Sequence, residues 1–269
     1  MNLPTVKLDR GIHVMHLFYS IQRERWTGLA SGESAQALQR LESLANKNNA
    51  PSHPKLRSYA VAGAKADLAF IIYAAELGTL AQLHRDLEHC FPAGTLIRDY
   101  SYLSVTELSE YMATEEDNRA ILAAEKFDDS AAFEKRATEL AQRKAEYEHY
   151  RLYPELPDWE VMGFYPMSKR RSGNDNWYSL SFDARKKLMA GHARVGRKYS
   201  GRISQLITGS TGLDDWEWGV TLMAHQVDAL KEIVYEMRFD EVSARYGEFV
   251  RFFIGLKMTP AELWPHLHL

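Results

Sequence analysis

The chain has 269 residues, 45% of them hydrophobic, which is enough for one or two domains with a proper core. Its formal net charge of -3 argues against nucleic acid as a partner, because no overall basic field would attract phosphates. A single cysteine, Cys90, excludes an internal disulfide framework. Because residues 1–10 lack an apolar signal core and no apolar run could span a bilayer, we expect a cytoplasmic protein without a membrane span.

The first half of the chain predicts the order strand, helix, strand, strand, helix, strand. Apolar residues on both faces of 11–21 indicate a buried strand, and three leucines at helical spacing mark 31–48 as an amphipathic helix. The six expected elements are 11–21, 31–48, 57–62, 67–75, 78–90 and 96–108.

A charged connector follows the first half. Residues 114–150 are rich in Glu, Lys, Arg and Ala and predict two mostly solvent-facing helices, broken near Asp128. Thr114 and Asp117 stand at the start of the first helix. Pro154 and Pro157 are incompatible with a helix interior and mark a linker.

The second half predicts the same order again. Its expected elements are 160–166, 182–199, 202–209, 216–224, 226–246 and 248–257. This order is that of the split βαβ or ferredoxin-like arrangement. We therefore expect an α+β fold with an N-terminal ferredoxin-like unit at 1–113, a helical connector and linker at 114–157, and a C-terminal ferredoxin-like unit at 158–269.

His192 is the first candidate site residue. Ser181 is a suitable N-cap for the helix 182–199, and His192 lies on its apolar stripe. Gly191 and Gly196 flank it, each costing a helix roughly 1 kcal/mol relative to alanine, which suggests that a wide, flat object approaches the backbone. A porphyrin with His192 as axial ligand would be such an object. From the helix alone, a core histidine bonded to a carbonyl is the simpler reading.

The strand end at 165–171 and the later Gln205 are the other unusual features. Tyr165 closes a buried strand, and Pro166 is expected to end its ladder pairing. The cations at 169–171 suit carboxylates or phosphates, although such a run is usually a solvated turn. Gln205 stands between two isoleucines. If this strand face is buried, the amide needs hydrogen-bond partners, and their absence would cost about 1 to 3 kcal/mol of stability. The alternative is an edge strand whose face is exposed to solvent.

Four separated motifs resemble the chlorite dismutase-like superfamily. They are Tyr-Pro-Met-Ser-Lys-Arg-Arg at 165–171, Gly-His-Ala-Arg-Val-Gly-Arg-Lys-Tyr at 191–199, the hairpin 209–219 and Tyr-Glu-Met-Arg-Phe-Asp-Glu-Val-Ser-Ala-Arg-Tyr-Gly at 235–247. Within it they look most like the coproheme decarboxylases, or HemQ type, of the coproporphyrin-dependent haem pathway. The match runs from about 152 to 256. Val250 and Arg251 depart from the small residues usual there.

The resemblance implies a fold and a reaction. The two ferredoxin-like βαββαβ units would form a dimeric α+β barrel within one chain, and the chains would assemble into a homo-oligomer, commonly a pentamer. The substrate would be iron coproporphyrin III (coproheme), which acts as its own redox cofactor. Hydrogen peroxide would convert two of its four propionates to vinyl groups, giving haem b and carbon dioxide. Transient contact with the iron-inserting chelatase would supply the substrate.

The resemblance also implies residue roles. His192 would be the axial ligand of the porphyrin iron, and Glu217 is a possible carboxylate partner for its second nitrogen. Tyr165 would be the catalytic residue that passes oxidation to the reacting propionate. The substrate-binding residues would be Arg151, Tyr165, Pro166, Met167, Ser168, Lys169, Gln205 and Ser243.

Two alternative functions stay open. The branch of the superfamily that splits chlorite carries a distal arginine where Gln205 stands here, and a fixed positive charge suits an oxyanion better than a neutral amide does. A chlorite dismutase-like haem enzyme is therefore the weaker reading. The second alternative is a non-catalytic protein that binds or carries haem.

Overall fold

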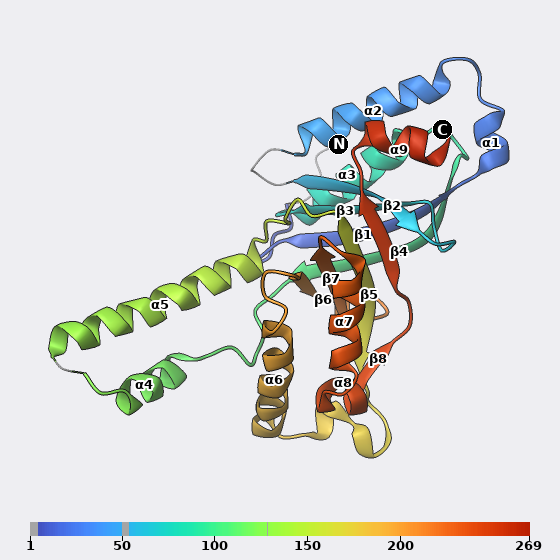
Figure 1. Ribbon diagram of the computed structural model, residues 1–269. Helices are drawn as coiled ribbons and strands as arrows, with labels where there is room; N and C mark the ends of the chain where they lie inside the picture. The colour runs from blue at the N-terminus through green and yellow to red at the C-terminus, as the bar shows by residue number, and fades with distance from the viewer. Residues whose placement is uncertain (1–4, 50–53, 128) are drawn as a thin grey trace.

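The computed structural model of the chain describes residues 5–49, 54–127 and 129–269 (Figure 1). Its strands are β1 (His13–Ile21), β2 (Lys55–Ala62), β3 (Leu68–Ala74), β4 (Leu96–Thr106), β5 (Val161–Lys169), β6 (Ser204–Gly209), β7 (Trp218–Ala224), β8 (Gly247–Phe249) and β9 (Phe253–Lys257). Its helices are α1 (Arg23–Thr27), α2 (Glu33–Lys47), α3 (Leu77–His89), α4 (Glu115–Ala124), α5 (Ser130–Leu152), α6 (Phe182–Arg197), α7 (Val227–Met237), α8 (Glu241–Tyr246) and α9 (Pro260–Leu267).

The strands form one antiparallel sheet that closes on itself. Its order is β7, β6, β4, β1, β3, β2, β9, β5, β8, and an additional pairing of β7 with β5 joins the two ends into a barrel. Each half supplies the order strand, helix, strand, strand, helix, strand, and the halves meet where β4 pairs with β6 and β2 with β9. The expected α+β fold of two ferredoxin-like units is confirmed.

Strand alternation separates the barrel interior from its outer face. On β5, Met162 and Phe164 belong to the interior cluster, whereas Val161 and Tyr165 belong to the cluster on the outer face of the C-terminal half. Successive residues of a strand point to opposite faces, so this division follows from the sequence. The interior is largely aromatic: the rings of Phe18 and Phe253 stack with centroids 3.9 Å apart.

Helices cover the outer faces of the barrel, and one of them is unusual. Helices α2, α3 and α9 pack on the N-terminal half, and α6 and α7 stand beside each other over the C-terminal half (Figure 1). Helix α2 buries Ala37 and Leu41, and α7 buries Ala229, Leu230 and Ile233. No residue of α6 is buried, although α6 occupies the place in the second unit that α2 occupies in the first.

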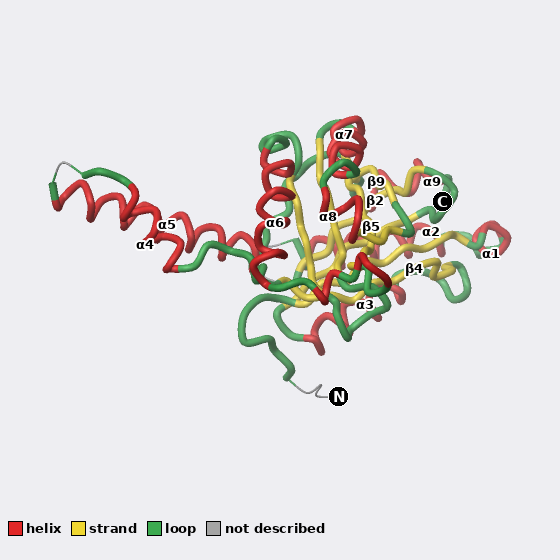
Figure 2. Tube along the Cα trace, turned by 90° about the horizontal axis from the view of Figure 1, so that it is seen from below, coloured by secondary structure: helices red, strands yellow, loops and turns green. Residues whose placement is uncertain are grey.

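Helices α4 and α5 extend away from the barrel as an arm, which both views show (Figures 1 and 2). Thr114 and Asp117 form a capping box at the start of α4, as the sequence suggested. The expected break near Asp128 falls on a residue outside the described ones, but the flanking residues end α4 at Ala124 and begin α5 at Ser130. Lys186 ties α4 to α6 through Asp117, at 3.0 Å.

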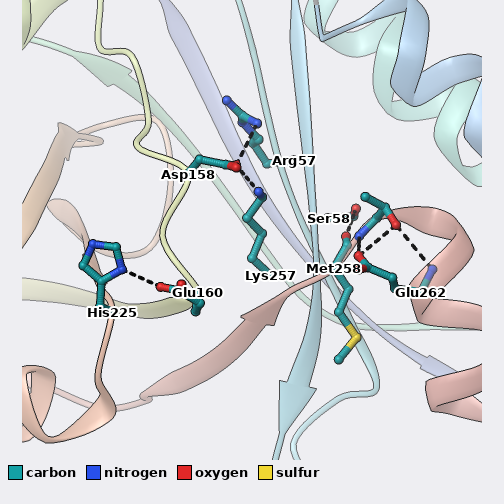
Figure 3. Close-up of polar contacts among 9 residues, drawn as sticks. Arg57, Ser58, Asp158, Glu160, His225, Lys257, Met258 and Glu262 are labelled. Atoms are coloured by element: carbon teal, nitrogen blue, oxygen red, sulfur yellow. Dashed lines mark hydrogen bonds and ion pairs between the residues drawn. The ribbon is translucent and has the colours of Figure 1, made fainter.

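The linker that follows α5 is fixed where the two halves meet (Figure 3). Asp158 pairs with Arg57 of β2, at 3.9 Å, and with Lys257 of β9. Glu160, at the entry to β5, pairs with His225 at 2.6 Å. No helix among the described residues is both long and apolar enough to cross a membrane.

Three predicted boundaries near the candidate site are wrong. Pro166 does not end pairing, because β5 continues to Lys169. On the β7 side of β5, Pro166 pairs with Gly219. On the opposite side, β9 pairs with β5 only as far as Phe164 and β8 begins to pair at Met167, so Pro166 falls in the gap between them. The proline therefore lies where no partner strand requires its missing N–H.

The helix expected at 226–246 is two helices. Helix α7 ends at Met237 and α8 begins at Glu241, because the side chain of Asp240 accepts a hydrogen bond from the backbone N–H of Ser243 at 3.2 Å and caps a new helix. The strand expected at 248–257 likewise divides into β8 and β9.

Candidate functional site

His192 lies in the middle of α6, whose N-terminus is capped by the hydroxyl of Ser181. Its Nδ1 donates to Oδ2 of Asp240, at 2.7 Å, and the imidazole is 25% exposed while the carboxylate is 6% exposed. A carboxylate on Nδ1 fixes the orientation and the tautomer of the ring. It leaves Nε2 as the nitrogen that can bind a metal.

Asp240 is the carboxylate partner of His192, which corrects the suggestion of Glu217. Glu217 instead accepts hydrogen bonds from the backbone N–H of Lys169 and the hydroxyl of Tyr178, each at 2.7 Å. Burial opposes ionisation of Asp240, but hydrogen bonds from His192 and Ser243 outweigh it and hold the pKa of Asp240 below its usual value. Asp240 is thus an anion that can stabilise a positive imidazole or a metal-bound one.

Lys169 and Ser243 lie around the same carboxylate. The Oγ of Ser243 donates to Oδ2 of Asp240 at 3.2 Å. The Nζ of Lys169 lies 4.9 Å from the centroid of the Trp177 ring, and the Lys169 side chain is buried. Burial lowers the pKa of Lys169 to about 8, although the charges of Asp240 and Glu217 act against that shift.

Tyr165 lies on the strand face that α6 and α7 cover. It is 7% exposed, and its ring contacts Phe249 edge-on at 5.8 Å and Phe252 at 4.7 Å between centroids. Burial raises the pKa of Tyr165 to about 12, and the nearby charge of Arg238 limits the rise. The phenol is therefore neutral at any physiological pH and can donate a hydrogen bond.

Gln205 approaches α6 from the sheet. In the sheet register it pairs with Leu222, which in turn pairs with Gly163, two residues before Tyr165. Its amide nitrogen lies 3.6 Å from the position that a Cβ on Gly196 would take, so the side chain reaches toward α6. No described residue hydrogen-bonds the side-chain amide of this half-buried glutamine.

The remaining predicted residues divide between the two faces of β5 and a separate element. Met167 shares the face of Tyr165 and is half-buried, whereas Pro166 and Ser168 are buried on the other face, where Ser168 Oγ accepts from the backbone N–H of Glu217 at 3.2 Å. Arg151, at the end of α5, donates to the carbonyl of Ile207 at 3.3 Å, and its buried Nε has no hydrogen-bond partner among the described residues.

These residues fit a flat, anionic ligand with a central metal. Helix α6 has no fully buried residue and only half-buried apolar side chains, Leu188 and Met189, and it stands over a strand face that carries Tyr165 and Gln205. Its counterpart α2 has the fully buried residues Ala37 and Leu41. The imidazole of His192 is already oriented by Asp240 and keeps one nitrogen for the metal. The sequence missed Asp240, although an Asp three residues before Ser243 is an N-cap signal.

Comparison with known proteins agrees with this architecture. The family model described as chlorite dismutase matches residues 33–258. A heme-binding protein from Thermus thermophilus is 37% identical, with a TM-score of 0.79, over 99% of this chain and 98% of that one. A mutant chlorite dismutase from Candidatus Nitrospira defluvii is 16% identical, with a TM-score of 0.71, over 97% of this chain and 98% of that one. The chain belongs to the chlorite dismutase family.

Proposed function

We propose that the protein is a coproheme decarboxylase, which uses hydrogen peroxide to convert two propionates of iron coproporphyrin III into the vinyl groups of haem b. The observation that carries this proposal is a single arrangement: an imidazole oriented by Asp240 opposite a strand face with a neutral phenol, Tyr165, and a neutral amide, Gln205. The heme-binding protein that is 37% identical over nearly the whole chain supports a porphyrin ligand.

The reaction balances without a further cofactor. Each propionate loses carbon dioxide, one proton and two electrons to become a vinyl group. One hydrogen peroxide per propionate accepts the two electrons, that proton and a second proton from solvent to become two waters. The iron porphyrin, when bound, supplies the redox chemistry with peroxide. The chain positions it, and the protein groups hold or move protons.

Each protein group has a proposed part. His192 binds the iron, and Asp240 keeps its ring in place. Tyr165 hydrogen-bonds the reacting carboxylate, and it would relay one electron and one proton from the propionate, the proton leaving a methylene carbon. Arg151, whose buried Nε has no partner in the described part of the chain, would bind another propionate. Ser243 and Lys169 lie around Asp240 and would have to turn toward the porphyrin edge to bind a propionate. Met167, on the face of Tyr165, would line the pocket, whereas Pro166 and Ser168 lie on the opposite face of β5 and would contribute only through the backbone.

The test is conversion by the purified protein. Iron coproporphyrin III and hydrogen peroxide should yield haem b, identified by mass spectrometry of the extracted porphyrin. Tyr165→Phe should bind the substrate with wild-type affinity and lose at least about a hundredfold in turnover, because phenylalanine cannot relay a proton. Full turnover by Tyr165→Phe would remove the phenol from its role, and absence of haem b from the wild type would reject the function.

Two other functions give different results in the same preparation. A chlorite-splitting enzyme would release dioxygen on addition of chlorite; the neutral Gln205 argues against it, because an oxyanion is better held by a fixed positive charge. A non-catalytic carrier would bind finished haem b tightly and leave iron coproporphyrin III unreacted after peroxide addition.

We further propose that the chain forms a ring of subunits, a pentamer, in the cytoplasm, and that it meets the iron-inserting chelatase only transiently. Native mass spectrometry would test the subunit number. A single species at the mass of one chain would contradict the ring.

A further inference from the structure

Glu107, which directly follows β4, lies on the sheet face that carries Tyr165. The register places in one row across the sheet Val105 of β4, Gly209 of β6, Trp218 of β7 and Met167 of β5. Paired residues of neighbouring strands share a face, and Met167 lies on the face of Tyr165. A Cβ on Gly209 would lie 2.4 Å from the carboxyl carbon of Glu107, so this carboxyl takes the place of a Gly209 side chain in the row. Glu107 therefore borders the face against which the proposed ligand lies.

The two carboxyl oxygens of Glu107 have different surroundings. Oε1 accepts a hydrogen bond from the indole Nε1 of Trp218 at 3.3 Å. Oε2 has no hydrogen-bond partner among the described residues, and Glu107 is exposed. One oxygen is thus fixed to the sheet, and the other is available to a ligand.

The electrostatic surroundings of Glu107 favour its neutral form. No cation in the described part of the chain forms an ion pair with it, although the charge of Arg151 acts on it from a longer distance. Loss of water around the carboxyl raises the pKa of Glu107, and the hydrogen bond from Trp218 and the charge of Arg151 oppose this rise only in part. The other titratable group within reach is Tyr102 of β4, which stays neutral because burial raises the pKa of its phenol.

We propose that Glu107 binds the porphyrin in its protonated form, as a hydrogen-bond donor from Oε2 to the propionate that Arg151 binds, so that ligand binding takes up one proton from solvent. This inference rests on the proposed function. Arg151 carries one positive charge, whereas an ionised Glu107 and the propionate would together carry two negative charges. Two carboxylates that share a site cannot both stay ionised without cost, and a proton between them forms a short, charge-assisted hydrogen bond.

Glu107→Gln tests the proposal, with Glu116→Gln as a matched control. Glutamine keeps a hydrogen-bond donor at this position and cannot ionise. Glu116 is exposed on α4, so its substitution makes the same change in net charge away from the sheet. Isothermal titration calorimetry follows the binding of iron coproporphyrin III without peroxide. Repeating it at one pH in buffers with different ionisation enthalpies gives the number of protons that binding takes up.

At pH 7 the wild type and Glu116→Gln should take up more protons than Glu107→Gln, by a number approaching one. Other groups of the site and the propionates also exchange protons, but these contributions are common to all three proteins. Because the wild type must gain a proton to bind, its affinity relative to that of Glu107→Gln should fall as the pH rises, by up to about tenfold per pH unit.

Glu107→Leu separates a hydrogen-bond donor from mere removal of a negative charge. Leucine is neutral but donates nothing, so Glu107→Leu should bind iron coproporphyrin III about tenfold to a hundredfold more weakly than Glu107→Gln, as expected for a lost hydrogen bond to a charged group. Equal affinities of these two variants would overturn the proposed donor.

The proposal is also overturned if Glu107→Gln and the wild type take up the same number of protons. Because these measurements need no turnover, a wild type that binds iron coproporphyrin III and never converts it would reject the proposed function while leaving the role of Glu107 intact. A wild type with no affinity for iron coproporphyrin III would overturn both.

Discussion

The carboxylate of Asp240 makes two kinds of contact: it caps the N-terminus of α8, and it accepts a hydrogen bond from His192. Asn is as good an N-cap as Asp, so Asp240→Asn should preserve α8. It should remove the negative charge from Nδ1 of His192 and weaken the binding of an iron porphyrin by about 10 to 100-fold. Absorbance titration measures the affinity, and the iron–histidine stretching frequency in resonance Raman spectra should fall.

The control for this substitution is Glu217→Gln. Glu217 is buried near Lys169 but does not touch His192. The iron–histidine frequency of Glu217→Gln should match that of the wild type. If the two variants shifted the frequency equally, the effect would be a general loss of negative charge and not the loss of a partner for the imidazole.

The buried ammonium of Lys169 predicts a pH dependence of stability. Its pKa falls from 10.5 to about 8 on folding, because burial disfavours the charged form. Below pH 8 the lysine is charged in both states and its burial reduces stability. Between pH 8 and 10.5 the unfolded chain binds more protons than the folded one, so this contribution to stability rises with pH.

The free energy of unfolding of Lys169→Met, relative to that of the wild type, should therefore fall as the pH rises. The difference between the two free energies of unfolding should change by up to about 3 kcal/mol between about pH 7 and 10.5, in favour of the wild type. Urea unfolding at several pH values measures it, with the exposed Lys198→Met as the control. A difference that stays constant with pH would contradict the buried, charged lysine.

At the scale of elements, α6 is held mainly by polar contacts, since none of its residues is fully buried and only Leu188 and Met189 pack, half-buried, against a small core cluster. Arg185 Nε donates to the hydroxyl of Tyr111 at 2.9 Å, and Lys186 pairs with Asp117. Hydrogen bonds that are not backed by apolar packing open more readily. In the ligand-free protein, the amides of α6 should exchange with solvent faster than those of α2.

Hydrogen exchange followed by mass spectrometry tests this difference between the two helices. Addition of iron coproporphyrin III should slow exchange in α6 and leave α2 unchanged, because only α6 gains an apolar contact. Equal exchange of α2 and α6 before addition, or a ligand effect on α2, would contradict the assignment of the ligand to the C-terminal half.

Element order was predictable from the sequence, but the junctions beside the site were not. Periodicity identified the strands and helices of both units, because burial on one face imposes it. The same periodicity carried the expected helix through 226–246, since Met237 and Ala244 both fit its apolar stripe, and so it hid the helix start at Asp240. Helix α9 was missed although Thr259 and Glu262 form its capping box.

The candidate site was predictable only where a residue is out of place for its element. His192 and Gln205 stand among apolar residues and were found for that reason. Asp240 carries a readable N-cap signal for α8, but nothing in the sequence indicates that it also binds His192. That contact is tertiary, and only the fold supplies it.

At the scale of the molecule, the two units share one sheet. Pairing of β4 with β6 and of β2 with β9 crosses between the halves, and the interior cluster contains residues of both. We therefore expect one cooperative unfolding transition. Tryptophan fluorescence and far-UV circular dichroism should give coincident urea curves. Two separated transitions would mean that the proposed units at 1–113 and 158–269 fold independently.

The contrast between α2 and α6 has a consequence for the design of variants. The two halves have the same element order, so α2 shows which side chains such a helix buries when it only covers the barrel. In α6 an imidazole and Gly196 stand on the inward face instead. Leucines at these two positions would raise the free energy of unfolding of the whole chain and remove the proposed iron ligand, so the chain gives up stability for binding.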